Sequence, residues 1–214
     1  MTARRAAVAA VLLCATSRVA AADRREASLH AHLVGAFLTA RDEASPSLGS
    51  GPLGGVAVRA SFATSNSYQY DLALSFLAGR VSFDEGRFTP MDLPERTGPF
   101  TITTQAARLD GGVTLRLGVR WIPTVRVAAG LQARHRGAPA ATVDGIAIDP
   151  SQIGRDADFQ LDAVGVADVG LDFRVNRRLI VGAAAGASYA VPLGGEAFRT
   201  VEVTVHAAYY WYPR

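Results

Sequence analysis

The stretch Asp110–Trp121, DGGVTLRLGVRW, alternates between two unlike faces without interruption. One face carries Val113 and Leu115, and the other carries Thr114 and Arg116. A repeat of two residues is that of a β-strand, because successive side chains point to opposite sides of a sheet. The pattern leaves two alternatives. In water the aliphatic face is the buried one, whereas in a bilayer the aliphatic face meets lipid and the arginines point inward.

Seven further segments alternate in the same way, which predicts an all-β chain of eight strands. The expected strands lie near residues 27–40, 53–64, 68–82, 101–120, 125–136, 158–174, 178–191 and 199–212. Most of them exceed the usual globular strand of about 5–6 residues and reach the roughly 9–11 residues with which a tilted strand crosses a bilayer. No stretch shows a convincing helical period.

Long and short connections alternate along the chain. Long connections are expected at Arg41–Pro52, Phe83–Phe100, Gly137–Ala157 and Pro192–Phe198. Tight connections are expected at 65–67, 122–124 and 176–177, and every proline is expected outside the strands, because proline cannot donate to a ladder. This arrangement is typical of an antiparallel up-and-down transmembrane β-barrel with short periplasmic turns and long external loops. Both chain termini are then periplasmic.

Aromatic residues decide between the two alternatives for the faces. On the apolar face one group lies near the tight turns, namely Tyr68, Tyr70, Trp121, Phe173, Tyr209 and Trp211. A second group lies toward the long loops, namely Phe37, Phe76 and Tyr189. Two aromatic belts around a band of Val, Leu and Ala are typical of a lipid-facing surface, whereas a soluble core places large rings centrally. We therefore predict a membrane barrel, with a secreted soluble barrel of lipocalin type as the alternative.

On these features, residues 27–212 resemble the small eight-stranded outer-membrane β-barrels, the class of OmpX, OmpW and the OmpA transmembrane domain. The resemblance is one of architecture. It implies the outer membrane of a diderm bacterium, contact with outer-membrane lipid and lipopolysaccharide, and insertion by the barrel-assembly machinery. Such proteins usually end in a strand with a terminal aromatic residue. Trp211 and Tyr212 fit that pattern, but Pro213 and Arg214 follow them.

The N-terminal segment resembles a secretory signal peptide, which we place at residues 1–22, ahead of a barrel domain at 23–214. It has a basic start, an apolar run over Ala6–Cys14 and an Ala-x-Ala site at Ala20–Ala22. Its removal takes away three arginines and the only cysteine, so the remaining chain has equal numbers of basic and acidic residues. This balance argues against nucleic-acid binding, and the lack of cysteine excludes a disulfide.

Alternation also places a set of charged side chains on the inner face of the predicted barrel. We predict an interior ion-pair network of Arg59, Asp71, Arg108, Asp110, Arg116, Arg126, Arg134, Asp162, Asp168, Asp172, Glu202 and His206. An eight-stranded barrel is just wide enough for side chains to fill it, and buried charges must be paired. A structural plug is therefore expected, with a narrow or gated porin for small solutes as the alternative.

Residues that carry chemistry give weaker patterns. His30 and His32 share a face with Glu202 and His206 across the closure of the barrel, but without a fixed ligand spacing they predict interior histidines and no metal site. For a lipid-processing enzyme, His135 would be the base. Its candidate nucleophile, Ser188, lies on a non-adjacent strand and the opposite face. We expect a non-enzymatic protein without cofactors.

The external loops are the expected sites of interaction. The connection at 83–100 mixes charge with Phe88, Met91 and Leu93, and the connection at 137–157 is locally acidic. Apolar residues in a solvated loop suggest a contact patch or a cover over the barrel mouth. The predicted function is therefore envelope structure or the docking of another envelope protein.

Overall fold

The computed structural model describes residues 26–42, 45–63, 67–88, 96–143, 146–148, 157–192 and 197–211. The strands in these ranges are β1 (Ala27–Asp42), β2 (Ser45–Ala63), β3 (Tyr68–Phe88), β4 (Arg96–Arg116), β5 (Trp121–Arg136), β6 (Ala140–Val143), β7 (Ile146–Ile148), β8 (Asp158–Arg174), β9 (Leu179–Pro192) and β10 (Phe198–Trp211). Within this part of the chain there is no helix of the length and apolar character needed to cross a membrane.

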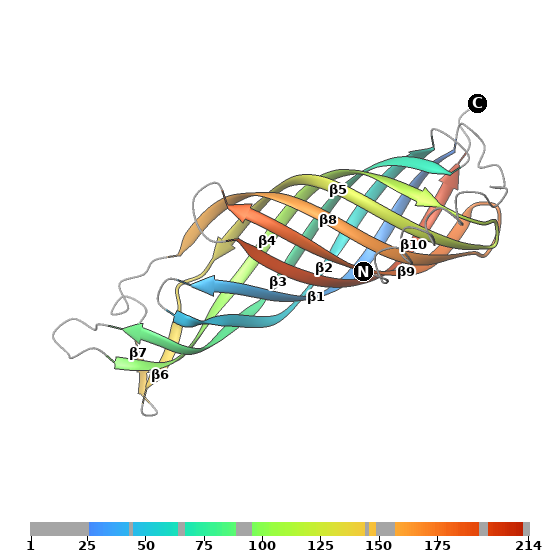
Figure 1. The fold of residues 1–214 in the computed structure, drawn as a ribbon. Coiled ribbons are helices and arrows are strands. Elements are labelled where there is room, and N and C mark those ends of the chain that lie inside the picture. The colour runs from blue at the N-terminus through green and yellow to red at the C-terminus, as the bar shows by residue number, and fades with distance from the viewer. Residues whose placement is uncertain are drawn as a thin grey trace, which may run out of the picture.

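Eight of the strands close into a ring in which every neighbour is antiparallel (Figure 1). The order is β1, β2, β3, β4, β5, β8, β9 and β10, and β10 pairs with β1 to complete the ring. β6 and β7 form a hairpin that extends the sheet from β4, through Phe100↔Ala141 and Thr101↔Ala140. The predicted eight-stranded antiparallel up-and-down barrel is confirmed.

The register around the ring sets the tilt of the strands. A path that steps from each residue to its paired residue on the next strand starts at Ser28 on β1 and, after one circuit of the ring, returns to β1 at Leu38, ten residues further along. The path is Ser28, Ser61, Asp71, Gly112, Ala128, Val166, Ser188, Thr200 and Leu38. With a rise of about 3.3 Å per residue and a spacing of about 4.8 Å between strands, this stagger corresponds to a tilt of about 40°. The interior of such a barrel is filled by side chains.

The outer surface of the barrel is an apolar band. On β10 the outward side chains of Val201, Val203 and Val205 are 60%, 56% and 52% exposed. From Val201 to Trp211 this strand spans roughly 25 Å along the barrel axis, which is the height of the lipid-facing band in bacterial outer-membrane barrels.

The aromatic residues predicted as belts point outward. The exposed ones at the tight-turn end are Tyr68, Tyr70, Trp121, Tyr209 and Trp211, and those toward the other end are Phe37, Phe76 and Tyr189. Phe173 also points outward but is half-buried, with its ring centroid 4.7 Å from that of Trp121.

Beyond the apolar band, the polarity of the two faces is inverted without a change of register. Along β3 the inward residues change from polar to apolar, in the order Gln69, Asp71, Ser75, Leu77, Val81 and Phe83. The outward residues of the same strand change from apolar to polar, in the order Leu72, Leu74, Phe76, Arg80, Ser82 and Asp84. Lipid outside permits a polar interior, whereas water outside requires an apolar one. We call the part of the sheet beyond the band, with the β6–β7 hairpin, the external extension, after the loops that the sequence analysis predicts to be external.

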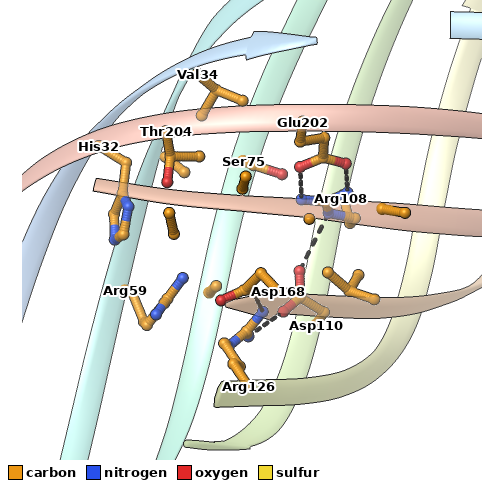
Figure 2. Close-up of a pocket in the computed structure, with 17 residues that line it drawn as sticks. His32, Val34, Arg59, Ser75, Arg108, Asp110, Arg126, Asp168, Glu202 and Thr204 are labelled. Atoms are coloured by element: carbon orange, nitrogen blue, oxygen red, sulfur yellow. Dashed lines mark hydrogen bonds and ion pairs between the residues drawn. The ribbon is translucent and has the colours of Figure 1, made fainter. Parts of the chain in front are cut away.

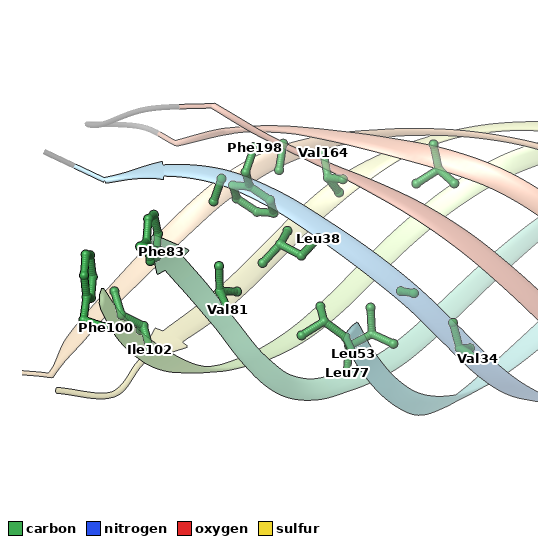
Figure 3. Close-up of a cluster of buried hydrophobic side chains, with 14 of the residues drawn as sticks. Val34, Leu38, Leu53, Leu77, Val81, Phe83, Phe100, Ile102, Val164 and Phe198 are labelled. Carbon is green, nitrogen blue, oxygen red and sulfur yellow. The ribbon is translucent and has the colours of Figure 1, made fainter. Parts of the chain in front are cut away.

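An apolar cluster fills the barrel at the base of the external extension (Figure 3). Its larger members are Leu38, Leu53, Leu77, Val81, Phe83, Phe100, Ile102 and Phe198. The Phe83 and Phe100 rings are stacked, with centroids 4.5 Å apart and planes at 4°. A smaller cluster lies at the tight-turn end and consists of Ile122, Ile180, Ala208 and Tyr210. The middle of the interior, between the two clusters, is polar.

Several predicted boundaries are wrong. The long connection expected at Arg41–Pro52 is not there, because β1 ends at Asp42 and β2 begins at Ser45. Most of Phe83–Phe100 belongs to β3 and β4, and Gly137–Ala157 contains β6 and β7. The tight turn expected at 122–124 lies instead at 117–120. It is formed around Gly118, whose φ of 104° is disfavoured for residues with a side chain.

The expectation that prolines lie outside the strands is also wrong. Pro46 and Pro52 are in β2, and Pro99, Pro123 and Pro192 are in β4, β5 and β9. Pro52 opposes Phe37 on β1, but toward β3 the paired register passes from Ser50 to Leu53 without it. The missing N–H is thus accommodated on one side of the strand. The predicted signal peptide lies outside the described residues.

Candidate functional site: the interior ion-pair network

Arg126 on β5 joins three carboxylates at the centre of the barrel. Its Nε and Nη2 donate to Oδ1 of Asp71 at 2.8 and 2.6 Å, and Nη2 also donates to Oδ1 of Asp110. Its Nη1 lies 3.7 Å from Oδ2 of Asp168. Asp71 also accepts a hydrogen bond of 2.8 Å from the hydroxyl of Thr114. Strands β3, β4, β5 and β8 are therefore connected through one guanidinium group.

Arg108 and Glu202 form the second centre, which spans the barrel from β4 to β10 (Figure 2). The Nη1 and Nη2 atoms of Arg108 donate to Oε1 and Oε2 of Glu202 at 2.6 and 2.9 Å, a bidentate pair. Ser188 donates to Oε1 of Glu202 at 2.9 Å. The Nε atom of Arg108 lies 3.2 Å from Oδ2 of Asp110, so the two centres share Asp110.

Toward the tight-turn end, Arg116 pairs with an acid that the sequence analysis did not include. Its Nη1 donates to Oε2 of Glu26 at 3.4 Å, and Nη2 of Arg174 lies 3.9 Å from Oε1 of the same residue. Glu26 precedes the first expected strand by one residue. It has the same parity as Ser28 and His30, so extension of the alternation by one step would have found it.

Arg134 and Asp162 form the pair nearest to the external extension. Nε of Arg134 lies 3.4 Å from Oδ2 of Asp162, and Nη2 donates to the side-chain oxygen of Gln160 at 2.5 Å. The guanidinium carbon lies 4.1 Å from the centroid of the Phe198 ring, which belongs to the apolar cluster. This pair therefore connects the polar interior to the apolar cluster.

Arg59 is the predicted member for which the structure shows no direct ion pair with any described residue. Its side chain points into a cavity of about 40 Å³ that is also lined by His32, Ser75 and Asp168 (Figure 2). Nε of Arg59 and Oγ of Ser75 are buried and have no hydrogen-bond partner in the protein. At roughly 10–15 Å³ of accessible volume for each water, a polar cavity of this size has room for about three.

Histidines from both closing strands meet beside this cavity. The ring centroids of His30 and His32 are 5.9 Å apart, and those of His32 and His206 are 4.8 Å apart. Nε2 of His206 lies 3.0 Å from Oδ1 of Asp172, and Oγ of Ser28 lies 2.9 Å from Nε2 of His30. Across the described ranges, no group of three or more His, Cys, Asp or Glu residues is arranged to hold a metal ion.

The structure separates the two residues considered for catalysis. His135 is exposed on the outer face of β5, whereas Ser188 is buried in the interior and donates to Glu202. A nucleophile must lie within hydrogen-bond reach of its base, so these two residues do not form a catalytic pair. Apart from Arg59, the predicted interior charges form pairs that join strands across the barrel.

No protein-family model matches the chain, and no curated protein sequence matches it. Among solved structures, Neisserial surface protein A is similar with a TM-score of 0.51 and 10% identity, over 85% of this chain and 96% of that protein. The attachment invasion locus protein of Yersinia pestis is similar with a TM-score of 0.48 and 10% identity, over 87% of this chain and 98% of that protein. The outer membrane protein OprG from Pseudomonas aeruginosa is similar with a TM-score of 0.46 and 7% identity, over 88% of this chain and 96% of that protein. Of these three similarities, only that to Neisserial surface protein A has a TM-score above 0.5, and at 10% identity it shows a shared fold and no more. The closed ring of eight antiparallel strands, the apolar band and this similarity give the chain the fold of the small outer-membrane β-barrels.

Proposed function

We propose that the chain is an integral outer-membrane barrel of a diderm bacterium, with a closed interior and a non-enzymatic role in envelope structure or partner docking. This proposal rests on one observation, which is that side chains fill the interior of the barrel. Arg126 and Arg108 cross it at the height of the apolar band, and the apolar cluster closes it toward the external extension. A solute would have to break buried ion pairs and also displace stacked aromatic rings.

Conductance in planar bilayers tests the closed interior. The purified protein is expected to insert without producing single-channel steps, because the paired charges and the apolar cluster leave no continuous water path. Reproducible steps from wild-type protein would overturn the proposal. The double variant Phe83→Ala/Phe100→Ala, which removes the stacked pair of rings from the cluster, is expected to stay closed as well, because the paired charges remain.

The second candidate function is a narrow or gated path for small solutes. The cavity beside Arg59 favours it, because this cavity provides a polar space within the barrel. In this reading, the ion pairs around Asp110 rearrange to connect the cavity to both ends. Steps that appear only above a threshold voltage in the wild type, and without that threshold when Arg108 and Glu202 are both replaced, would support the gated path over the closed barrel.

The external extension is the proposed docking surface. β3 and β4 continue beyond the apolar band and pair as far as Phe88↔Arg96, and the β6–β7 hairpin extends the sheet further from β4 (Figure 1). The two loops predicted as interaction sites, 83–100 and 137–157, both contribute to this extension. Lipopolysaccharide and another envelope protein are the expected partners there, and the barrel-assembly machinery is the expected partner during insertion.

Capture from envelope fractions tests docking. Wild-type protein is compared with a variant in which the β3–β4 hairpin is shortened to close after Ser82 and before Thr101. A partner that is retained by the wild type and lost by the shortened variant supports docking. An identical set of captured proteins would overturn docking through this hairpin and leave envelope structure as the role.

The proposed orientation places the tight turns and both termini in the periplasm. The only cysteine is Cys14, in the predicted signal peptide, so single cysteines provide clean labels. Ser82→Cys lies on the external extension and Arg177→Cys lies in the β8–β9 turn. A membrane-impermeant maleimide applied to whole cells is expected to label the first variant only. Labelling of the second variant alone would reverse the orientation.

A further inference from the structure

Arginine and aromatic side chains gather at the tight-turn end of the barrel, on β5, β8 and β10 and on the β4–β5 and β8–β9 turns. We define the short-turn rim as Arg120, Trp121, Phe173, Arg178 and Tyr209. Arg120 ends the β4–β5 turn and Arg178 ends the β8–β9 turn, and both are exposed. The rings lie outward on β5, β8 and β10, at the lower edge of the apolar band.

Contacts with the rings hold the two arginines in place. The guanidinium of Arg120 lies over the ring of Phe173, 5.4 Å from its centroid, and the same ring packs on Trp121. Nη1 of Arg178 donates to the hydroxyl of Tyr209 at 3.3 Å. The backbone is also fixed at both positions, since the carbonyl of Arg120 accepts from Arg174 and that of Arg178 accepts from Tyr210.

Positive charge at this rim has no acid beside it in the described residues of the two turns. Arg120, Arg177 and Arg178 are exposed, and the described residues of the β4–β5 and β8–β9 turns, 117–120 and 175–178, include no acid. The nearest acids, Glu26 and Asp172, point into the barrel and are buried. They are already paired with interior partners. The exposed guanidinium groups therefore face the surroundings with unused hydrogen-bond donors.

We propose that the short-turn rim binds the headgroup phosphate of an anionic phospholipid, such as phosphatidylglycerol, in the leaflet on the tight-turn side. This rests on the proposed function, which places the apolar band in the membrane. Aromatic rings of this kind sit at the level of the headgroups, and a guanidinium pairs with a phosphate through two parallel hydrogen bonds. An arginine held on a ring at that level has already lost much of its conformational freedom, which favours binding.

Trp121 provides the assay, because it belongs to the rim and the chain has only one other tryptophan, Trp211. In a Trp211→Phe background, the protein is reconstituted in phosphatidylcholine vesicles that contain a fixed fraction of brominated lipid. Quenching of Trp121 by brominated phosphatidylglycerol is compared with quenching by brominated phosphatidylcholine in the same variant. The ratio gives the relative association constant of the anionic lipid next to this residue.

The relative constant is expected to be at least about fivefold in favour of phosphatidylglycerol and to fall to about one in Arg120→Gln/Arg178→Gln, since each basic residue near an anionic surface contributes roughly a factor of five. The matched control is Arg80→Gln/Arg199→Gln, which removes two outward arginines at the opposite end. This control is expected to keep the preference.

Equal quenching by the two lipids in the parent protein would overturn the inference, and so would a preference that survives in Arg120→Gln/Arg178→Gln. A preference lost in the Arg80→Gln/Arg199→Gln control as well would overturn it too, because net charge would then be the cause. Failure of the proposed function has a different signature: a protein outside the bilayer shows no quenching by either brominated lipid.

Discussion

Replacement of Arg108 by methionine is expected to destabilise the barrel strongly through a charge that has lost its partner. Arg108 and Glu202 form a bidentate pair at 2.6 and 2.9 Å, and both side chains are only 8% exposed. After Arg108→Met, the hydrogen bond from Ser188 is the one that Glu202 keeps among the described residues. Breaking a buried pair by removing one partner costs about 3–5 kcal/mol. Asp110 also loses its contact with Nε of Arg108, which argues for the upper part of this range.

A second substitution separates the effect of the charge from that of the volume. In Arg108→Met/Glu202→Leu the unpaired carboxylate is gone, and replacement of a buried pair by apolar residues is often neutral or stabilising. The double variant is therefore expected to recover most of the loss, to within about 1–2 kcal/mol of the wild type.

The assay is reversible urea unfolding in lipid vesicles, followed by tryptophan fluorescence. For a slope of about 2–3 kcal/mol/M, a loss of about 4 kcal/mol lowers the urea midpoint by roughly 1.5 M. Arg199→Gln, on the same strand as Glu202 but exposed on the outer face, is the control and is expected to change stability by less than about 0.5 kcal/mol. The reasoning is refuted if Arg108→Met costs less than about 1 kcal/mol, or if the double variant is as unstable as the sum of the two single variants.

The remaining predictions use the same unfolding assay. Val203→Arg, in the middle of the outward band, is expected to cost about 2–4 kcal/mol in vesicles, and a neutral result would favour a soluble barrel. Phe100→Ala removes a ring that is 2% exposed and is expected to cost about 3–5 kcal/mol; a cost below about 1 kcal/mol would mean that the apolar cluster is not packed. Gly118→Ala places a side chain at a φ of 104° and is expected to cost about 1–2 kcal/mol, whereas no cost would mean that the turn adopts another form. Arg116→Glu opposes Glu26 in a buried position, so the variant is expected to lose more stability than the same reversal in the exposed β8–β9 turn, and equal losses would contradict the pairing.

The fold was predictable because a period of two assigns each side chain to a face, and the aromatic residues then identify which face is outward. The ends of the strands were less predictable, because the polarity of the two faces is inverted beyond the band. The pattern of apolar outward residues by which such a strand is recognised therefore ends near Arg80. The start of β2 was not predictable for another reason. Its sequence, SPSLGSGP, has the composition of a loop. Gly49 is nevertheless a strand residue, and its lack of a side chain leaves room for the ring of Phe83.

Ion-pair partners were not predictable from alternation, since alternation gives the face of a residue but not its height in the barrel. Height depends on the stagger between strands, which the register of the folded chain determines. Arg108 is 94 residues from Glu202 and meets it only because the ring closes with this stagger. For the same reason the sequence could not show that Arg59 faces a cavity while Arg126 takes the nearby carboxylates.

The inversion of polarity bears directly on the choice between a pore and a closed barrel. In the proposed membrane location, lipid covers the apolar outer face at the height of the band, so paired charges and not hydrophobic burial hold the interior together there. Beyond the band the sheet would be surrounded by water, and the inward residues Leu77, Val81 and Phe83 form a core like that of a soluble protein. A conducting state would have to disrupt both kinds of interaction at once, whereas a docking role uses them as they are. The apolar core keeps the external extension rigid, and a rigid surface loses little conformational entropy when a partner binds.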